Sequence, residues 1–339
     1  MNMPSPAGDT RPRTAVLHQW VGMGDLVWHI PYFRKVAETS SGGQVSVIAS
    51  PTTFARELLG HEPWAREVID FDRHPRRTEG RAGRHRGVAG LFRMGDELKP
   101  MGFERIVLFT NHGNRAIVAW WAGIPQRIGY GTSCLQRLLL TKTPWIEQYK
   151  GAAVTAYKDA TAFALAQGWC DAPILPRLVV RADSLARMQA RLAALPRPLH
   201  ALSIGSSEPY KQWGDANFAA LANRLADRGH GVLLVGGPAE REMAQAIVQR
   251  IAPANASRVS VLTDGTVSET VAAMSLAQCC AGNDTGACNI AAAVDTPTFV
   301  ILGPRPPLEH DPDTLHLIQA PRLEDITPDA VAQRMLAAL

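Results

Sequence analysis

Residues 14–30 read TAVLHQWVGMGDLVWHI, and this stretch carries the pattern that decides the fold. A short apolar run at 14–18 ends at a glycine-rich turn over 21–25. Apolar residues at helical spacing follow, from Leu26 to Ala37. A strand, a glycine turn and a helix in this order predict the first unit of a parallel sheet that is covered by helices on both faces.

The same unit recurs along the chain. In the first half, strands are predicted at 45–49 and 106–109, each followed by a helix, at 53–59 and 114–121. In the second half, strands are predicted at 199–204, 231–235, 259–262, 278–281 and 298–302, with helices at 215–228 and 239–251. Ligands of such sheets bind beyond the carboxyl ends of the strands, so the strand-to-helix turns are the places to look for chemistry.

Four prolines between 173 and 198 mark a linker between two halves of similar length. We therefore predict an α/β protein with two doubly wound, Rossmann-like domains that face a cleft. The predicted parts are an N-terminal domain over 1–180, a C-terminal domain over 181–325, and a helix over 326–339 that could pack back on the N-terminal domain.

The composition is that of a globular protein, with 46% apolar and 19% charged residues among 339. It excludes a disordered or fibrous chain, and the net charge of +4 is too small to indicate a nucleic-acid binder. The five cysteines are odd in number and have no CxxC spacing, which predicts free, buried thiols. We find no secretory signal and no membrane-spanning run, and so expect a cytoplasmic protein.

The first glycine turn brings Asp25 to the start of a helix. Aspartate is a favoured N-cap residue, so a structural explanation stays open beside a catalytic or binding one. A dinucleotide fingerprint is not supported, because Val27 stands where its third glycine would fall.

The second turn, GSSEPYKQW at 205–213, follows a predicted strand with hydroxyl residues and a lysine. The hydroxyls of Ser206 and Ser207 and the ammonium group of Lys211 would suit an anion such as a diphosphate. An ordinary polar loop with a solvated lysine remains the alternative.

The third turn, GNDTGACN at 282–289, leads into an alanine-rich helix. Free backbone amides and the positive end of the helix dipole make such a helix start a suitable anion site. The polar cluster is denser than an N-cap requires, so we favour a binding role here.

The segment 73–93 differs from the rest, because it holds seven arginines and four glycines and has little periodic apolar content. We expect a mobile surface loop. It would either bind phosphates or acidic sugars at an anionic membrane surface, or be a solvated insertion.

Two further features are expected to be structural. The short DxD matches at 70–72 and 311–313 are interpreted as a strand end or a solvated loop, and Trp120 and Trp121 as core residues.

Together, the three turns resemble glycosyltransferase family 9, the bacterial ADP-heptose:lipopolysaccharide heptosyltransferases. Four segments carry the resemblance in the family's order: VGMGDLVWHIP at 21–31, SIGSSEPYKQWGDANFAAL at 203–221, GVLLVGGPAERE at 231–242 and AGNDTGACNIAAAVDTPTFVILGP at 281–304. They span nearly the whole chain, and the resemblance implies the two-domain GT-B fold.

The resemblance also implies roles for individual residues. Asp25 would be the general base on the acceptor hydroxyl, Ser207 and Lys211 would hold the donor's diphosphate, and Asp284 would bind the donor sugar. The full donor-binding set would be Ser206, Ser207, Lys211, Gly236, Gly237, Asp284, Thr285, Gly286 and Asn289. The acceptor-binding set would be Gly22, Gly24, Arg73, Arg76, Arg77, Arg81 and Arg84.

One position departs from the family's Asp-Thr-Gly-x-x-His pattern. Asn289 stands where the histidine is expected. Asparagine can donate a hydrogen bond, but it cannot carry a charge near neutral pH.

The implied reaction is an inverting, metal-independent transfer of heptose from ADP-heptose to a lipopolysaccharide core or related glycan. Lys211 and the helix start at Thr285 and Gly286 would stabilise the departing diphosphate in place of a metal ion. The expected partners are the ADP-sugar and an anionic glycolipid or glycan, with neither a metal nor nucleic acid, and the protein could contact the inner membrane face. The alternatives are a sugar-nucleotide epimerase of the same fold and a relative that binds nucleotide sugars without transferring them.

Overall fold

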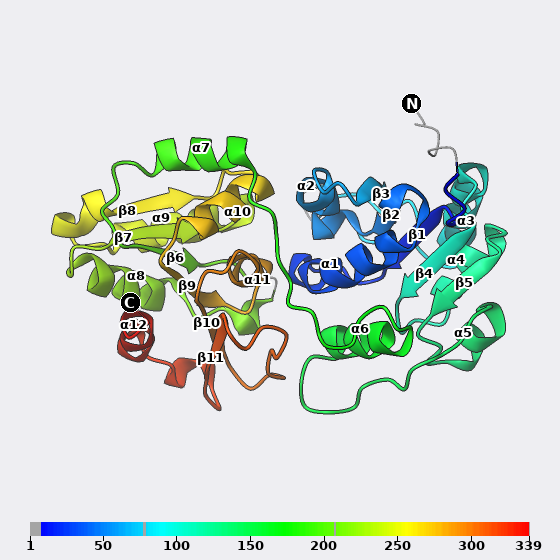
Figure 1. Cartoon of the computed structure of the whole chain (residues 1–339). Helices are drawn as coiled ribbons and strands as arrows, with labels where there is room; N and C mark the ends of the chain where they lie inside the picture. Colours follow the sequence, from blue (N-terminus) through cyan, green and yellow to red (C-terminus); the bar gives the residue numbers. More distant parts are fainter. Residues whose placement is uncertain (1–7, 77–78, 207, 339) are drawn as a thin grey trace. The chain divides into compact units, whose positions relative to one another are not determined.

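Five parallel strands form one sheet in the first half of the chain (Figure 1). The computed structural model describes residues 8–76, 79–206 and 208–338. The strands stand in the order β3-β2-β1-β4-β5. Their bounds are β1 (Thr14–His18), β2 (Val45–Ala49), β3 (Ala65–Asp70), β4 (Arg105–Phe109) and β5 (Gln126–Gly129). Strands β1 and β2 are fully buried and β4 is buried after its first residue, as their largely apolar runs predict.

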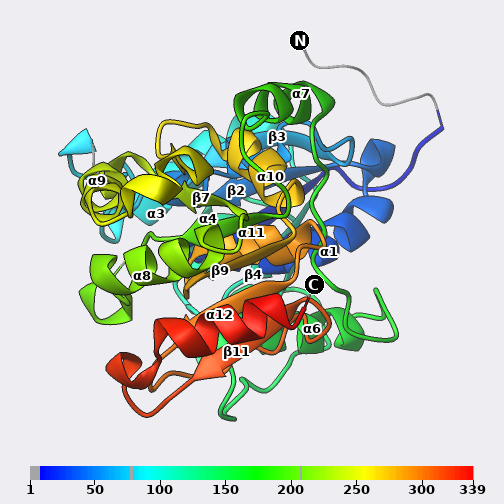
Figure 2. The same cartoon turned by 90° about the vertical axis from the view of Figure 1, so that its left-hand side faces the viewer.

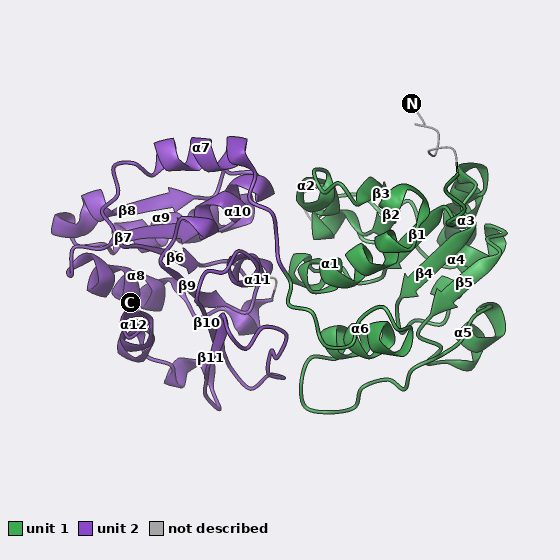
Figure 3. Ribbon diagram, viewed as in Figure 1, with its two compact units in different colours: residues 1–176 green, residues 177–339 purple. Residues whose placement is uncertain are grey.

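Helices cover both faces of this sheet. Helices α1 (Met23–Glu38) and α6 (Thr155–Ala166) pack together, and α3 (Ala89–Leu98) packs against α4 (Arg115–Trp121), which contacts α5 (Cys134–Leu139). The short α2 (Ala55–Leu59) precedes β3. This unit comprises Met1–Pro176 (Figure 3).

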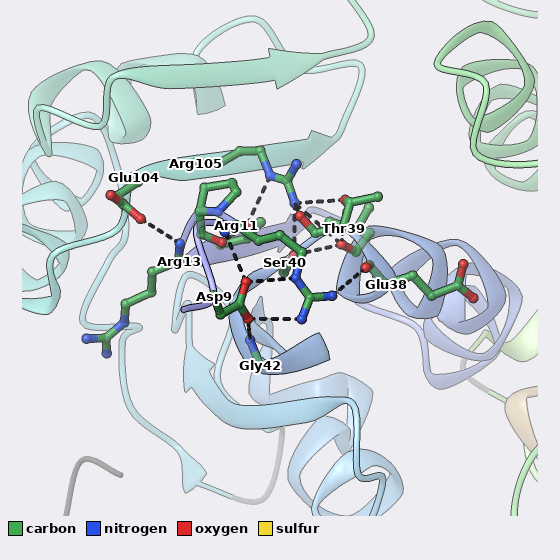
Figure 4. Close-up of polar contacts among 12 residues, drawn as sticks. Asp9, Arg11, Arg13, Glu38, Thr39, Ser40, Gly42, Glu104 and Arg105 are labelled. Atoms are coloured by element: carbon green, nitrogen blue, oxygen red, sulfur yellow. Dashed lines mark hydrogen bonds and ion pairs between the residues drawn. The ribbon is translucent and has the colours of Figure 1, made fainter. Parts of the chain in front are cut away.

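The amino-terminal edge of the first sheet is fixed by the contacts of the half-buried Arg105 (Figure 4). Arg105, at the start of β4, donates hydrogen bonds to Thr14 Oγ1 at 3.0 Å and to Thr39 O and Ser40 Oγ at 2.9 Å. These contacts join β4 to β1 and to the end of α1. Burial lowers the pKa of Arg105, whose guanidinium is satisfied by these neutral oxygen atoms.

Six parallel strands form the sheet of the second unit, Arg177–Leu339, in the order β11-β10-β9-β6-β7-β8. Their bounds are β6 (Leu199–Ser203), β7 (Gly231–Val235), β8 (Val259–Leu262), β9 (Cys279–Asn283), β10 (Thr298–Leu302) and β11 (Leu315–Gln319). Two doubly wound α/β units are therefore confirmed.

Two helix layers cover the second sheet. One holds α8 (Asp215–Ala226) with α9 (Arg241–Gln249) and α12 (Pro328–Leu336), and the other holds α10 (Val267–Ser275) with α7 (Ala182–Arg191) and α11 (Gly286–Ala293). The first layer and the sheet enclose a core that includes Phe218, Ile247 and Phe299.

The last helix, α12, is an integral part of the second unit and not a separate segment. It lies beside α8 (Figures 1 and 2), and Val331 and Met335 are fully buried in the core of this unit. The expected segment 326–339 therefore belongs to the C-terminal unit, because its apolar face completes that core.

Two expectations about packing are wrong. Trp120 and Trp121 are 49% and 37% exposed, because α4 lies on the outer layer and turns these side chains to its surface. All five cysteines are free, but Cys134 is exposed and Cys170 is half-buried.

The buried His200 of the second unit, which contacts the half-buried His230, makes the stability of this unit depend on pH. His200 Nε2 lies 2.9 Å from His230 Nδ1, and His200 Nδ1 lies 3.1 Å from Cys279 Sγ. Burial, and next the neighbouring His230, lowers the pKa of His200 from 6.5 to about 4. The unfolded chain therefore binds more protons at this site between these two pH values, so stability falls as the pH falls through this range.

We expect the free energy of unfolding to drop between pH 7.5 and 5.0, with roughly 1–2 kcal/mol of the loss due to His200. Urea unfolding at the two pH values measures this loss. His200→Gln removes the titrating ring, so this variant should lose less stability than the unsubstituted protein. An equal loss in both proteins would contradict the assignment.

Candidate functional site

The three glycine turns named from the sequence all lie at the carboxyl edges of the two sheets. The chain reverses its direction of strand addition between β1 and β4 in the first sheet and between β6 and β9 in the second. The turns after these strands carry the candidate residues, as expected for ligand sites of doubly wound sheets.

In the second unit, Asn283 joins the turn after β9 to the turn after β6. Its side chain is fully buried at the end of β9. Its Nδ2 donates to Ile204 O at 3.1 Å, to Gly205 O at 3.0 Å and to Gln212 Oε1 at 2.8 Å. Its Oδ1 accepts a hydrogen bond of 3.0 Å from the backbone N–H of Trp213. One asparagine thus holds both ends of the 205–213 turn against the neighbouring strand.

Four charged side chains meet at this edge. Lys211 Nζ lies 2.8 Å from Glu208 Oε2 and 3.8 Å from Asp284 Oδ2. Arg305, in the turn after β10, places Nη1 3.2 Å from Asp284 Oδ2 and 3.9 Å from Glu208 Oε2. The structure therefore brings together Lys211 and Asp284, as the sequence predicts, and adds Glu208 and Arg305.

The carboxyl group of Asp284 holds a proton more tightly than a solvent-exposed aspartate does. Burial, and next the neighbouring Glu208 carboxylate, raises its pKa to about 6. This side chain can therefore lose its negative charge in mildly acidic conditions, which favours an anion beside it.

The third turn leads directly into α11. Thr285 is the N-cap residue, its Oγ1 shares a hydrogen bond of 3.0 Å with Ser203 Oγ, and Gly286 is the first residue of the helix. Asn289 is buried, and its Nδ2 donates to Thr285 O at 3.0 Å, within the first turn of the helix. This amide thus makes a helix-internal contact at the position where the family pattern has a histidine.

The remaining donor-site candidates lie in the adjoining turns. Gly236 and Gly237 follow β7, where Gly237 N donates to Glu240 Oε2 at 2.7 Å. Ser206 Oγ donates to Glu208 O at 2.7 Å and so stabilises its own turn. Ser207 lies outside the described residues.

In the first unit, Asp25 is the third residue of α1 and Gly22 is the N-cap. Asp25 Oδ2 accepts a hydrogen bond of 3.2 Å from Gly22 N, so the carboxylate takes part in capping the helix. A Cβ at Gly22 would lie 2.4 Å from this oxygen, so a larger residue there would displace the Asp25 carboxylate, and Gly24 is buried in the first turn. The helix start thus fixes the position of the Asp25 carboxylate.

A pocket of about 170 Å³ lies at the carboxyl edge of the first sheet. Its lining comes from the ends of four strands and includes His18, Trp20, Ser50, Arg73, His74, His112 and Arg115. Val21, at the start of the Asp25 turn, also lines it.

The two arginines make this pocket cationic. Burial, and next the charge of Arg73, lowers the pKa of Arg115 to about 10. The Nε atoms of both arginines are buried without a hydrogen-bond partner among the described residues, and so are both ring nitrogens of His18. An anion with several acceptor oxygens would accept hydrogen bonds from the two arginine Nε groups.

The other acceptor-site arginines do not line this pocket. Arg76 pairs with Glu57, Arg81 with Asp72 and Glu79, and Arg84 with Glu97. They line a separate groove beside β3, and Arg77 lies outside the described residues. Of the predicted acceptor arginines that the structure describes, Arg73 therefore reaches the pocket.

Most described residues of segment 73–93 are exposed, but the segment is anchored at a few buried positions, and its last residues belong to α3. Buried Asp72 pairs with Arg81, and its backbone N–H donates to His85 Nδ1 at 3.0 Å. His85 O in turn accepts a hydrogen bond of 3.1 Å from Arg73 Nη1. Gly83 and Gly90 pack closely against neighbouring backbone atoms, whereas Gly80 and Gly87 have open space beside them.

Sequence reasoning missed four residues of these sites: Asn283, Glu208, Arg305 and Arg115. The first two stand inside quoted motifs, and Arg305 follows the last motif directly. Arg115 had a detectable signal, because it follows a predicted strand at the start of a predicted helix.

No group of three His, Cys, Asp or Glu side chains among the described residues is arranged to hold a metal ion. The DxD match at 70–72 contributes Asp72 to the ion pair with Arg81. Within the described ranges, no helix is long and apolar enough to cross a bilayer.

Comparison with known proteins agrees with this geometry. The family model described as glycosyltransferase family 9 (heptosyltransferase) matches residues 91–320, which is more than half of the chain. The chain belongs to glycosyltransferase family 9. It is therefore a glycosyltransferase of the heptosyltransferase type.

Individual relatives support this assignment to family 9. Lipopolysaccharide heptosyltransferase 2 of Escherichia coli K12 is 26% identical over 352 aligned residues, which cover 94% of this chain and 96% of the relative. Lipooligosaccharide heptosyltransferase 2 of Haemophilus influenzae is also 26% identical, over 93% of this chain and 96% of the relative.

Solved structures show the same GT-B fold. The E. coli ADP-heptose lps heptosyltransferase II superposes with a TM-score of 0.73 at 21% identity, covering 96% of this chain and 98% of that one. A family 9 glycosyltransferase from Veillonella parvula gives 0.79 at 18% identity, covering 98% and 100%. E. coli heptosyltransferase WaaC with ADP-2-deoxy-2-fluoro heptose gives 0.71 at 18% identity, covering 96% and 100%.

Close packing of segment 73–93 can be tested at Gly90. A Cβ at this position would lie 2.0 Å from the carbonyl carbon of His85. We expect Gly90→Ala to lower the free energy of unfolding by roughly 1–3 kcal/mol, because the backbone must move apart. Thermal unfolding measures this effect, with Val88→Ala as a control because Val88 is 65% exposed. An unchanged Tm for Gly90→Ala would mean that the segment packs loosely.

Proposed function

We propose that this protein transfers heptose from ADP-heptose to an anionic lipopolysaccharide-core acceptor, with inversion at the anomeric carbon and without a metal ion. The observation that carries the proposal is the position of Lys211. The Lys211 side chain is 12% exposed, and its Nζ lies 3.8 Å from Oδ2 of Asp284. Asp284 stands in the turn that leads into the amino end of α11. A lysine and free helix amides together suit a diphosphate.

Solved relatives support ADP-heptose as the donor. E. coli heptosyltransferase WaaC has been solved with ADP and with ADP-2-deoxy-2-fluoro heptose. By this analogy, the donor-binding residues would be Ser206, Ser207, Lys211, Gly236, Gly237, Asp284, Thr285, Gly286 and Asn289.

The proposed reaction is a single displacement. Asp25 removes the proton from an acceptor hydroxyl, and the oxygen attacks the anomeric carbon from the face opposite the diphosphate. The bond from the anomeric carbon to the diphosphate oxygen breaks, and ADP leaves with that electron pair. Lys211 and the amides at Thr285 and Gly286 stabilise the negative charge on the oxygen atoms of the departing diphosphate. In metal-dependent glycosyltransferases, a metal ion stabilises this charge.

The cationic pocket of the first unit is the proposed acceptor site. Arg73 and Arg115 offer guanidinium groups to a carboxylate or phosphate of the acceptor, and the pocket extends to Val21 in the Asp25 turn. Gly22 and Gly24 keep this turn compact. Arg76, Arg77, Arg81 and Arg84 remain predictions as acceptor residues.

An activity assay with purified acceptor and ADP-heptose, in the presence of a chelator, tests the proposal. We expect release of ADP together with the extended acceptor, and a loss of about 10²–10⁴ in kcat for Asp25→Asn, because the base is removed. A strict metal requirement, or release of a free epimerised sugar nucleotide without an acceptor, would contradict it. Binding of ADP-heptose without any transfer would indicate the non-catalytic alternative.

The acceptor pocket has a separate kinetic signature. We expect Arg115→Gln to raise the KM for the acceptor by roughly tenfold or more, since a charged hydrogen bond is lost, while the Kd for ADP stays unchanged. Arg56→Gln is the matched control, because Arg56 is an exposed arginine of the same unit, paired with Asp70. An acceptor KM that does not change in Arg115→Gln would exclude the pocket.

A further inference from the structure

Arg305 takes no part in the proposed reaction, but its position in the second unit is fixed by several contacts. It follows β10, and its backbone oxygen accepts a hydrogen bond of 3.0 Å from Gln319 Nε2 of β11. Its guanidinium carbon lies 5.7 Å from the centre of the Tyr210 ring. The side chain is 25% exposed and points to the cluster of Lys211, Glu208 and Asp284.

The hydrogen-bonding capacity of Arg305 is not used up by this cluster. Nη1 is buried and lies 3.2 Å from Asp284 Oδ2, but it makes no hydrogen bond of acceptable angle with any described residue. A planar guanidinium forms its strongest contacts with two oxygen atoms of one anion. The arginine is therefore close to Asp284 without being aligned with it.

The charge balance of the cluster also indicates that a bound diphosphate would require a second cation besides Lys211. Lys211 and Arg305 face the carboxylates of Glu208 and Asp284, so the four charges balance. A nucleoside diphosphate adds at least two negative charges, which Lys211 alone would not offset. Asn289 supplies no charge, and its amide donates to Thr285 O within α11.

We propose that Arg305 is a second diphosphate-binding cation of the donor site, which donates to the phosphate oxygens of a nucleoside diphosphate and exchanges its contact with Asp284 for them. The Asp284 carboxylate is then free of its contact with Arg305 and can contact the sugar of the donor. This inference rests on the proposed function, because it concerns the donor site.

Calorimetric titration of the full-length protein with ADP tests the inference. The variants are Arg305→Gln, Asp284→Asn and the double substitution, with Arg322→Gln as the control. Arg322 is 72% exposed and pairs with Asp325 in the same unit, so it matches the loss of one paired arginine charge. ADP lacks the sugar, so a function of Asp284 in sugar binding does not enter the measurement.

We expect Arg305→Gln to weaken ADP binding by roughly tenfold or more, since a charge-assisted contact is lost, and Arg322→Gln to change it less than twofold. The loss should persist when Asp284→Asn is already present, because Arg305 contacts the phosphates directly. Should Arg305→Gln unfold, Arg305→Lys provides the test, and it should retain part of the affinity because it keeps the charge.

An ADP affinity within twofold of the unsubstituted value in Arg305→Gln would overturn the inference. A loss that disappears in the Asp284→Asn background would overturn it too, because Arg305 would then act through Asp284. If the protein prefers UDP or GDP, the same variants are titrated with that nucleotide. The proposed donor is then wrong, but the function of Arg305 is still tested. Failure to bind any nucleoside diphosphate would overturn both.

Discussion

The four hydrogen bonds of the buried Asn283 side chain are the constraint on which the charged cluster of the second unit depends. They join the end of β9 to both ends of the 205–213 turn. Without them, Lys211 would stand on a long polar turn with no fixed relation to Asp284. A buried amide that satisfies all its partners fixes one geometry, because every alternative leaves polar groups unpaired.

In both units, the candidate site residues lie at the carboxyl edge of the sheet. In the first unit, Arg105 fixes the amino-terminal edge, while the carboxyl edge holds the Asp25 turn and a pocket lined by Arg73 and Arg115. In the second unit, the carboxyl edge holds the charged cluster that Asn283 organises. Parallel strands bring turns that are distant in sequence to the same edge, and this allows so few residues to form each site.

The sequence predicts the strands at the buried centre of each sheet, and of the four edge strands it predicts β8 but not β3, β5 or β11. The continuous apolar runs of β1, β2, β4, β6 and β7 identify central strands, whereas β3, β5 and β11 are half-exposed edge strands without such runs. The site shows a similar division. Asp25, Lys211 and Asp284 stand in turns with recognisable motifs, but the partners Arg305 and Glu208 depend on how neighbouring turns meet. In segment 73–93, the sequence does not distinguish the closely packed Gly83 and Gly90 from Gly80 and Gly87, which have open space beside them.

The most direct test of this account is the ADP affinity of Asn283→Ala, measured together with amide hydrogen exchange over 205–213. Asn255→Ala is the matched control, because Asn255 is also buried in the second unit and donates to Asp227, away from the turn. We predict a folded protein with faster exchange in the turn and an ADP affinity at least roughly tenfold weaker, since the positioning of Lys211 is lost. Asn255→Ala should lower stability without changing ADP binding. Unchanged ADP affinity and exchange in Asn283→Ala would contradict the account.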